Sequence, residues 1–350
     1  MENSNLPYSK HSVLFAPMEG ITDVAYREAV MRLFPEWDMF ATDFLRIPTE
    51  GTISEKKAIE HIGERIYQTP ALRDKTTFQI LTTARANTEQ ALEIISSLDI
   101  NHLDLNLGCP SRRVNAHGGG SFLLSDLQTL EKIILLIRKK WNRCFTVKIR
   151  AGYKDDTTFE EVIKLMNNCG VEGITIHGRT RDQMYKGVAS WDYFARAVKI
   201  SEVPIIANGD IWTAEDIEKV FNETGAYAVM CARSAMKTPW LASEYQLYQV
   251  AKENFLSEKS KRFFDLSPKY FNELEASYQT DGLEENHILK KFKALIRYIF
   301  DDFEGGELFK RDLLRTPELP VFKEKLSLAR ERMLAFSRNE LDLSSSRPTH

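Results

Sequence analysis

Eight short apolar runs, separated by amphipathic segments, are the feature that most constrains the fold of this chain. Most of the runs are rich in Val, Ile and Phe, as is typical of strands buried on both faces. They are Val13–Met18, Met39–Phe44, Thr77–Leu81, His102–Leu107, Phe145–Arg150, Gly173–His177, Pro204–Asn208 and Ala226–Cys231. Eight such alternations predict an α/β fold, a TIM (β/α)8 barrel. A doubly wound open sheet is the alternative, but the early GxGxxG turn that would support it is missing.

The segments between these runs carry apolar residues three and four apart, which predicts helices. These helices are expected at Asp23–Phe34, Thr88–Leu98, Leu127–Trp141, Thr158–Asn168, Trp191–Ile200 and Thr213–Glu223. Four of them have a plausible capping residue at the start: Thr88, Asp126, Thr158 and Thr213.

From Ser243 onward the pattern changes, because no strand-like run appears there. Helices are expected at Ser243–Asn254, Pro268–Ser277, Glu284–Phe303 and Phe322–Arg338. We therefore predict a barrel domain over residues 1–242 and a small all-α helical domain over residues 243–338. The Ser-rich end, residues 339–350, is expected to be a disordered tail.

Composition narrows the classes of function. The formal net charge of −3 offers no global basic field, so any nucleic-acid site must be a local patch. The four cysteines form no CxxC pair, which argues against a zinc site or a disulfide scaffold and fits a reducing cytoplasm. No apolar run approaches ~18 residues, so no membrane span is expected. We expect a cytoplasmic monomer without a metal.

A turn at Gly108-Cys109-Pro110 follows the His102–Leu107 run and places Cys109 on a loop just past a strand end. A thiol held there is suited to proton or nucleophile chemistry. The simpler interpretation is that Cys109 is a small buried hydrophobe.

Polar residues recur at the carboxyl ends of the predicted strands, which is the active face of a TIM barrel. Each has an ordinary explanation alone: His177 could be a core histidine, and Asn208-Gly209-Asp210 could be only a turn. Buried together, however, cationic and imidazole groups need an anion or a polar ring. The loops with Asn208 and Arg233 suit a phosphate. Gln79, Lys148 and His177 then remain for a ring system, which suggests flavin mononucleotide (FMN) across the barrel mouth beneath Cys109.

Several motifs, in this order, resemble the tRNA-dihydrouridine synthase family: APMEGITD, LNLGCPS, VKIRAGY, HGRT and IIANGDI, followed by Ala232-Arg233. The resemblance is dense over Val13–Trp240 and looser beyond. Glu19, the TDFLR segment and the triple glycine at Gly118–Gly120 are most like the bacterial C-type branch, the tRNA-dihydrouridine(16) synthases. One departure is Ala232, where the family usually has Gly.

The resemblance implies the following roles. Cys109 is the proton donor. FMN is bound by Pro17, Met18, Glu19, Gln79, Lys148, His177, Asn208, Gly209, Asp210, Ala232 and Arg233. Substrate contacts are expected from Asn106, Arg150, Arg179, Arg46, Arg112 and Arg113 near the barrel mouth, and from Lys291, Lys293 and Arg297 in the helical domain.

The implied reaction reduces the C5–C6 double bond of a uridine in the tRNA D-loop, with U16 as the expected position. Hydride passes from reduced FMN to C6, Cys109 protonates C5, and NADPH is the expected reductant. Two alternatives stay open. One is an FMN barrel that reduces a small pyrimidine or an enone, and the other is a non-catalytic RNA-binding protein.

Overall fold

The computed structural model describes residues 5–300 and 306–331, and it divides the chain into two compact units. The first unit comprises the segment up to Val24 together with Trp37–Ala232. The second comprises Ala25–Glu36 together with the segment from Arg233 onward. An early stretch of the chain therefore belongs to the same unit as the C-terminal helices.

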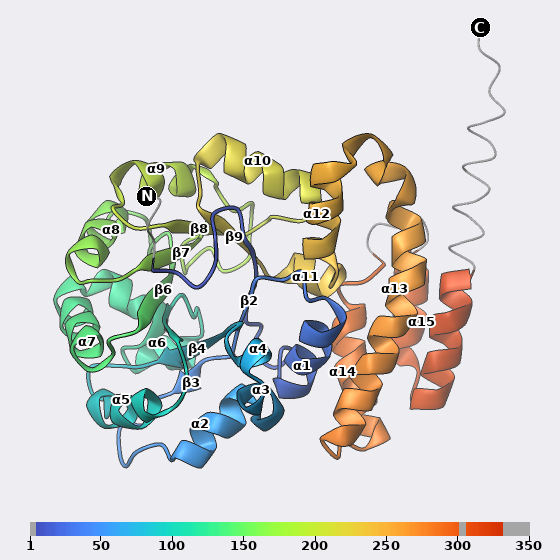
Figure 1. Cartoon of the computed structure of the whole chain (residues 1–350), viewed down its shortest axis with the longest axis horizontal. Coiled ribbons are helices and arrows are strands. Elements are labelled where there is room, and N and C mark those ends of the chain that lie inside the picture. Colours follow the sequence, from blue (N-terminus) through green and yellow to red (C-terminus); the bar gives the residue numbers. More distant parts are fainter. Residues whose placement is uncertain (1–4, 301–305, 332–350) are drawn as a thin grey trace, which may run out of the picture. The chain divides into compact units, whose positions relative to one another are not determined.

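The first unit is built on a closed barrel of eight parallel strands (Figure 1). Its strands are β1 (Val13–Phe15), β2 (Met39–Ala41), β4 (Thr76–Leu81), β5 (His102–Leu107), β6 (Cys144–Arg150), β7 (Gly173–His177), β8 (Ile205–Asn208) and β9 (Ala228–Cys231). Pairing of β2 with β4, at Phe40–Thr76 and Ala41–Thr77, closes the ring. A two-residue strand, β3 (Leu45–Arg46), adds to β4. The predicted TIM barrel is confirmed, and the closure excludes the open sheet.

Helices surround these strands (Figure 1). The barrel unit contains α2 (Glu55–Ile62), α3 (Glu64–Gln68), α4 (Pro70–Arg73), α5 (Thr88–Ser97), α6 (Arg112–Ala116), the 3-10 helix η1 (Gly120–Ser125), α7 (Leu127–Lys140), α8 (Phe159–Asn168), α9 (Asp192–Ile200) and α10 (Ala214–Thr224). The five longer helices predicted between the strands from β4 to β9 are confirmed. Helices α2 to α4, between β3 and β4, were not predicted.

Two of the four predicted helix caps are confirmed. The Asp126 carboxylate accepts from the Thr129 N–H, and Thr213 forms a reciprocal capping box with Asp216. The other two residues make no capping hydrogen bond, although Thr158 does occupy the N-cap position of α8. Thr88 is itself the first residue of α5, and its hydroxyl pairs with that of Thr82. Thr158 precedes α8, but its hydroxyl donates to the carbonyl of Leu124.

The second unit is helical. It contains α11 (Arg233–Lys237), α12 (Leu241–Val250), α13 (Lys252–Thr280), α14 (Glu285–Ile296), α15 (Gly306–Arg315), a helical segment over residues 319–331, and nearly all of α1 (Val24–Leu33). The predicted helix at Glu284–Phe303 ends at Ile296, and α15 was not predicted. Residues 332–338 of the last predicted helix and the predicted tail, residues 339–350, lie outside the described residues.

Pro268 marks a second error in the predicted boundaries, because it lies inside the long helix α13 instead of starting a helix. An interior proline removes one backbone hydrogen bond and costs about 3 kcal/mol. Buried aromatic side chains close to it offset that cost: the Tyr270 hydroxyl donates to that of Tyr26 at 3.0 Å, and the Tyr270 ring contacts Phe271. Packing between α13 and α1 therefore decides the helix length, and it explains why α1 groups with this unit.

Within the described residues, we find no helix with both the length and the apolar composition that a membrane crossing requires.

Candidate active site

The carboxyl ends of β4 to β8 bring together five of the predicted site residues. Asn106 on β5 lies opposite Lys148 on β6, and His177 on β7 lies opposite Asn208 on β8. Gln79 lies on β4 and is fully buried. Because all strands are parallel, these side chains share one end of the barrel, which is the end where TIM-barrel enzymes place their chemistry.

The backbone of Cys109 is held on both sides. Its N–H and that of Gly108 donate to the Asn106 Oδ1, at 2.9 and 3.1 Å. Its carbonyl accepts from the Ser121 hydroxyl at 2.9 Å and the Asn115 amide at 3.1 Å. The loop after β5 is therefore rigid, as a positioned catalytic group requires.

The predicted glycine run after this loop has a structural reason. Gly120 has φ +58°, and a Cβ there would lie 3.1 Å from the Cys109 carbonyl oxygen and 3.2 Å from the Cys109 Cβ. Only glycine combines this left-handed conformation with so close an approach.

The Cys109 thiol is 7% exposed and packs with Leu81, Val114 and Phe44. Burial raises its pKa above the ordinary value, against a smaller opposing effect of a backbone hydrogen bond at Ser111. The charges that act on it are Glu19, which raises the pKa further, and Arg46 and Arg150, which lower it. The thiol is therefore protonated at neutral pH, which is the form that a proton donor needs.

A buried chain of hydrogen bonds extends below Cys109 and was missed from the sequence. Asn106 Nδ2 donates to Gln79 Oε1 at 2.8 Å, and Gln79 Nε2 donates to Asp104 at 2.8 Å. The Asp104 carboxylate also accepts from Thr146 at 2.7 Å, and Thr146 contacts the His102 ring at 2.9 Å. The available signal was the alternation in HLDLNL, which places three polar residues on one face of a buried strand.

Burial sets the charge states in this chain. It raises the pKa of Asp104 to about 6, although the hydrogen bonds from Thr146 and Gln79 and the charge of Lys148 oppose the rise. Burial also lowers the pKa of His102 to about 3, so His102 is neutral. Near neutral pH Asp104 is therefore mainly an anion surrounded by uncharged hydrogen-bond donors.

The features around Lys148 fit a polar ring with partial negative charge. Its Nζ donates to Asn208 Oδ1 at 3.1 Å, and burial lowers its pKa to about 8. Gly209, which follows β8, has φ +115°, and a Cβ there would lie 3.4 Å from the His177 ring. The nearest atom to that Cβ would be the Ala189 Cβ, at 3.0 Å, so glycine here allows close packing of the turn. The buried ammonium and the imidazole are the polar groups that the ring of a flavin would fit.

Arg150 and Arg179 are engaged by the protein itself. Arg150 donates to the carbonyls of Gly108, Thr180 and Met184, all at 2.9 Å. Arg179, 1% exposed, pairs with Asp210 at 2.6 Å and also binds the Gly187 carbonyl. These contacts brace the Cys109 loop and the turn after β8, and the substrate contacts expected of Arg150 and Arg179 stay a prediction.

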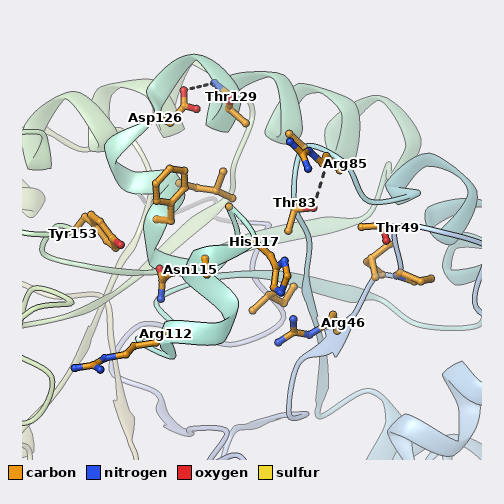
Figure 2. Close-up of a pocket in the computed structure, with 18 of the residues that line it drawn as sticks. Arg46, Thr49, Thr83, Arg85, Arg112, Asn115, His117, Asp126, Thr129 and Tyr153 are labelled. Atoms are coloured by element: carbon orange, nitrogen blue, oxygen red, sulfur yellow. Dashed lines mark hydrogen bonds between the residues drawn. The ribbon is translucent and has the colours of Figure 1, made fainter.

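The loops at this end of the barrel also line a cavity of about 1220 Å³ (Figure 2). Arg46 and Arg112, both exposed and both predicted as RNA contacts, line it from β3 and α6. Arg85 and Arg181 were not predicted and add to its positive charge, and His117, which was not predicted either, is a further lining residue. Glu50 and Asp126 also contribute to the lining. The exposed Arg113 lies beside Arg112 on α6.

The remaining predicted residues come from other elements. Pro17, Met18 and Glu19 follow β1, where the first two are half-buried and Glu19 is exposed. Ala232 follows β9, and Arg233 begins α11 in the second unit. Lys291 and Lys293 are half-buried on α14, and the exposed Arg297 follows that helix. Among the described residues, no group of three or more His, Cys, Asp or Glu side chains could hold a metal ion.

Comparison with known proteins agrees with this geometry. A family model described as dihydrouridine synthase (Dus) matches residues 14–330. The chain is 30% identical to tRNA-dihydrouridine synthase B of Xanthomonas axonopodis pv. citri over 240 residues, covering 68% of this chain and 70% of that protein. It is 31% identical to the tRNA-dihydrouridine(16) synthase of Cupriavidus necator over 234 residues, covering 66% and 72%. The chain therefore belongs to the dihydrouridine synthase family, whose members form dihydrouridine in tRNA.

Proposed function

We propose that this protein reduces the C5–C6 double bond of U16 in the tRNA D-loop, with FMN as its cofactor and NADPH as its reductant. Two observations support the proposal. A protonated thiol lies on a rigid loop at the barrel mouth, and a buried cation lies on the neighbouring strand. A relative named as a (16) synthase supports the choice of position.

FMN would lie across the strand ends. Lys148, Gln79 and His177 would bind its ring, and Pro17, Met18 and Glu19 would line it. The turn Asn208–Asp210, together with Ala232 and Arg233, would hold its phosphate. When bound and reduced, FMN supplies the hydride that adds to uracil C6.

The chain's own contribution is the proton. The Cys109 S–H bond breaks and its hydrogen adds to C5, so uracil gains one hydride and one proton in all. The resulting thiolate lies in the field of Arg46 and Arg150, both of which favour the negative form. Solvent then returns a proton to sulfur.

The RNA contacts would come from basic side chains in both units. Arg46, Arg112 and Arg113 border the barrel mouth, and Lys291, Lys293 and Arg297 would bind phosphates from the helical domain, residues 243–338. The target base must leave its stack to reach the barrel. We place this reaction in the cytoplasm and assign it to a monomer.

Two measurements test the proposal together. Purified protein should absorb as a flavoprotein, and tRNA from cells lacking the gene should lose dihydrouridine at position 16 and regain it on complementation. Loss at a different position would overturn the U16 assignment. Unchanged tRNA, together with reduction of free pyrimidines, would favour a small-molecule reductase.

A further inference from the structure

The two amide side chains below Cys109 can be satisfied in only one orientation. Asn106 Oδ1 receives two backbone N–H groups, which can only donate. Its Nδ2 must therefore face Gln79 and meet an oxygen. Gln79 then points its Oε1 toward Asn106 and its Nε2 toward residue 104, so Nε2 requires an acceptor at position 104.

Asp104 supplies that acceptor. An ionised carboxylate only accepts, and here it receives Gln79 on one oxygen and Thr146 on the other. Beyond Thr146 the partners can adapt, because a hydroxyl and a neutral imidazole can each reverse donor and acceptor roles. Asp104, Gln79 and Asn106 are all buried, so water does not readily replace a lost partner.

The charged and titratable groups that act on Asp104 come from several elements. Lys148 on β6 favours its anionic form. Tyr8, before β1, and Cys144, at the start of β6, also interact electrostatically with it. His102 lies two residues before it on β5 and is neutral.

We propose that Asp104 is a positioning residue for Cys109: the acceptor oxygen that it offers to Gln79 fixes, through Gln79 and Asn106, the conformation of the Gly108–Cys109 loop. The role of this hydrogen-bond network in catalysis rests on the proposed function. The direction of the hydrogen bonds in the network, that is, which group donates and which accepts, does not depend on that function and is tested on the protein without substrate.

Exchanging the amide and the carboxylate at positions 106 and 104 changes which groups donate and accept while leaving side-chain size nearly unchanged. These variants therefore separate the direction of the hydrogen bonds from side-chain packing. In Asn106→Asp the new carboxylate must accept from Gln79, so Gln79 turns and its Oε1 faces the Asp104 carboxylate, which leaves two acceptors opposed. In Asp104→Asn the new amide oxygen still accepts from Gln79, and its NH₂ donates to a reversed Thr146. In the double variant the whole chain reverses, and every group is satisfied again.

The readout is hydrogen exchange at the Gly108 and Cys109 amides in the full-length protein, with α7 as the reference for global folding. We expect exchange about tenfold faster in Asn106→Asp, because the hydrogen bond between Gln79 and Asp104, worth about 1–1.5 kcal/mol, is lost and the loop opens more readily. Asp104→Asn and the double variant should stay within roughly threefold of the wild type.

A pH series adds a second readout. Lowering the pH lets Asp104 take up a proton in Asn106→Asp, and its O–H can then donate to Gln79 Oε1, so the unfolding midpoint of this variant should move back toward that of the wild type. The double variant should not show this recovery. If Asn106→Asp fails to fold, a folded double variant supports the proposal equally.

Three results would overturn the proposal: wild-type protection in a folded Asn106→Asp, a double variant no better than Asn106→Asp, or an Asp104→Asn as unprotected as Asn106→Asp. None of these depends on whether tRNA is the substrate. A result that overturns the proposed role of the hydrogen-bond network is therefore distinct from a result that overturns the proposed function.

Discussion

Replacing Gly120 by alanine should disturb Cys109 directly, and Gly118 provides a matched control. Both residues have positive φ, +58° and +74°, so alanine introduces a backbone strain of about 1–2 kcal/mol at either position. At Gly118 nothing lies within 4 Å of the added Cβ. At Gly120 the added Cβ meets Val114 at 3.0 Å and the Cys109 carbonyl oxygen at 3.1 Å.

The difference between the two variants isolates this crowding. We expect Gly118→Ala to lose about 1–2 kcal/mol of unfolding free energy and to keep its activity. Gly120→Ala should lose a further ~1–3 kcal/mol from overpacking. Its kcat should fall roughly 10- to 100-fold as the thiol is displaced.

Urea unfolding and steady-state turnover on tRNA measure both effects. Equal unfolding free energies and equal kcat values for the two variants would refute the claim that Gly120 fixes the position of Cys109.

Three further predictions concern charge. In flavin-free protein, the pKa of Lys148 is about 8 in the folded state against an ordinary 10.5. Between pH 8 and pH 10.5 the unfolded chain therefore binds more protons than the folded one, and the free energy of unfolding should rise with pH. Lys148→Met should flatten that rise in urea titrations, and an unchanged slope would contradict the assignment. Arg179→Met should lower the unfolding free energy by about 3–5 kcal/mol, because it removes the positive charge that neutralises Asp210. The double variant Arg179→Met with Asp210→Asn should recover part of that loss. No recovery of unfolding free energy would argue against the ion pair. Replacing Lys291 and Lys293 by Gln should reduce the salt slope of tRNA binding by about 1 for each phosphate that these lysines neutralise, whereas the same change at the exposed Lys132 and Lys139 of α7 should not; equal slopes would remove α14 from the interface.

The barrel was predictable because parallel strands covered by helices read as uniformly apolar runs. The predicted caps Thr88 and Thr158 show the limit of local sequence, because neither makes a capping hydrogen bond and both hydroxyls have partners outside the first turn of their helices. Pro268 was read as a helix start for a similar reason. The aromatic packing that carries α13 through it comes from α1, more than 200 residues earlier in the chain.

At the candidate site, residue types and strand ends could be predicted, but partners could not. From the sequence, Arg150 and Arg179 were interpreted as cationic side chains available to bind substrate. Each donates to a carbonyl of the loop around Met184 and Gly187, and no local sequence pattern identifies these partners. Asp104 was overlooked because a carboxylate inside an apolar strand has meaning only once Gln79 and Thr146 converge on it from neighbouring strands.

Single-turnover reduction of tRNA by the Cys109→Ala enzyme, loaded with reduced FMN, tests the central claim most directly. Cys169→Ala is the control, because that thiol is also buried but follows α8. We predict that Cys109→Ala binds FMN and tRNA as the wild type does and forms dihydrouridine about 10²- to 10⁴-fold more slowly, the usual contribution of a positioned acid. A wild-type rate of dihydrouridine formation in Cys109→Ala would contradict the assignment of Cys109 as proton donor.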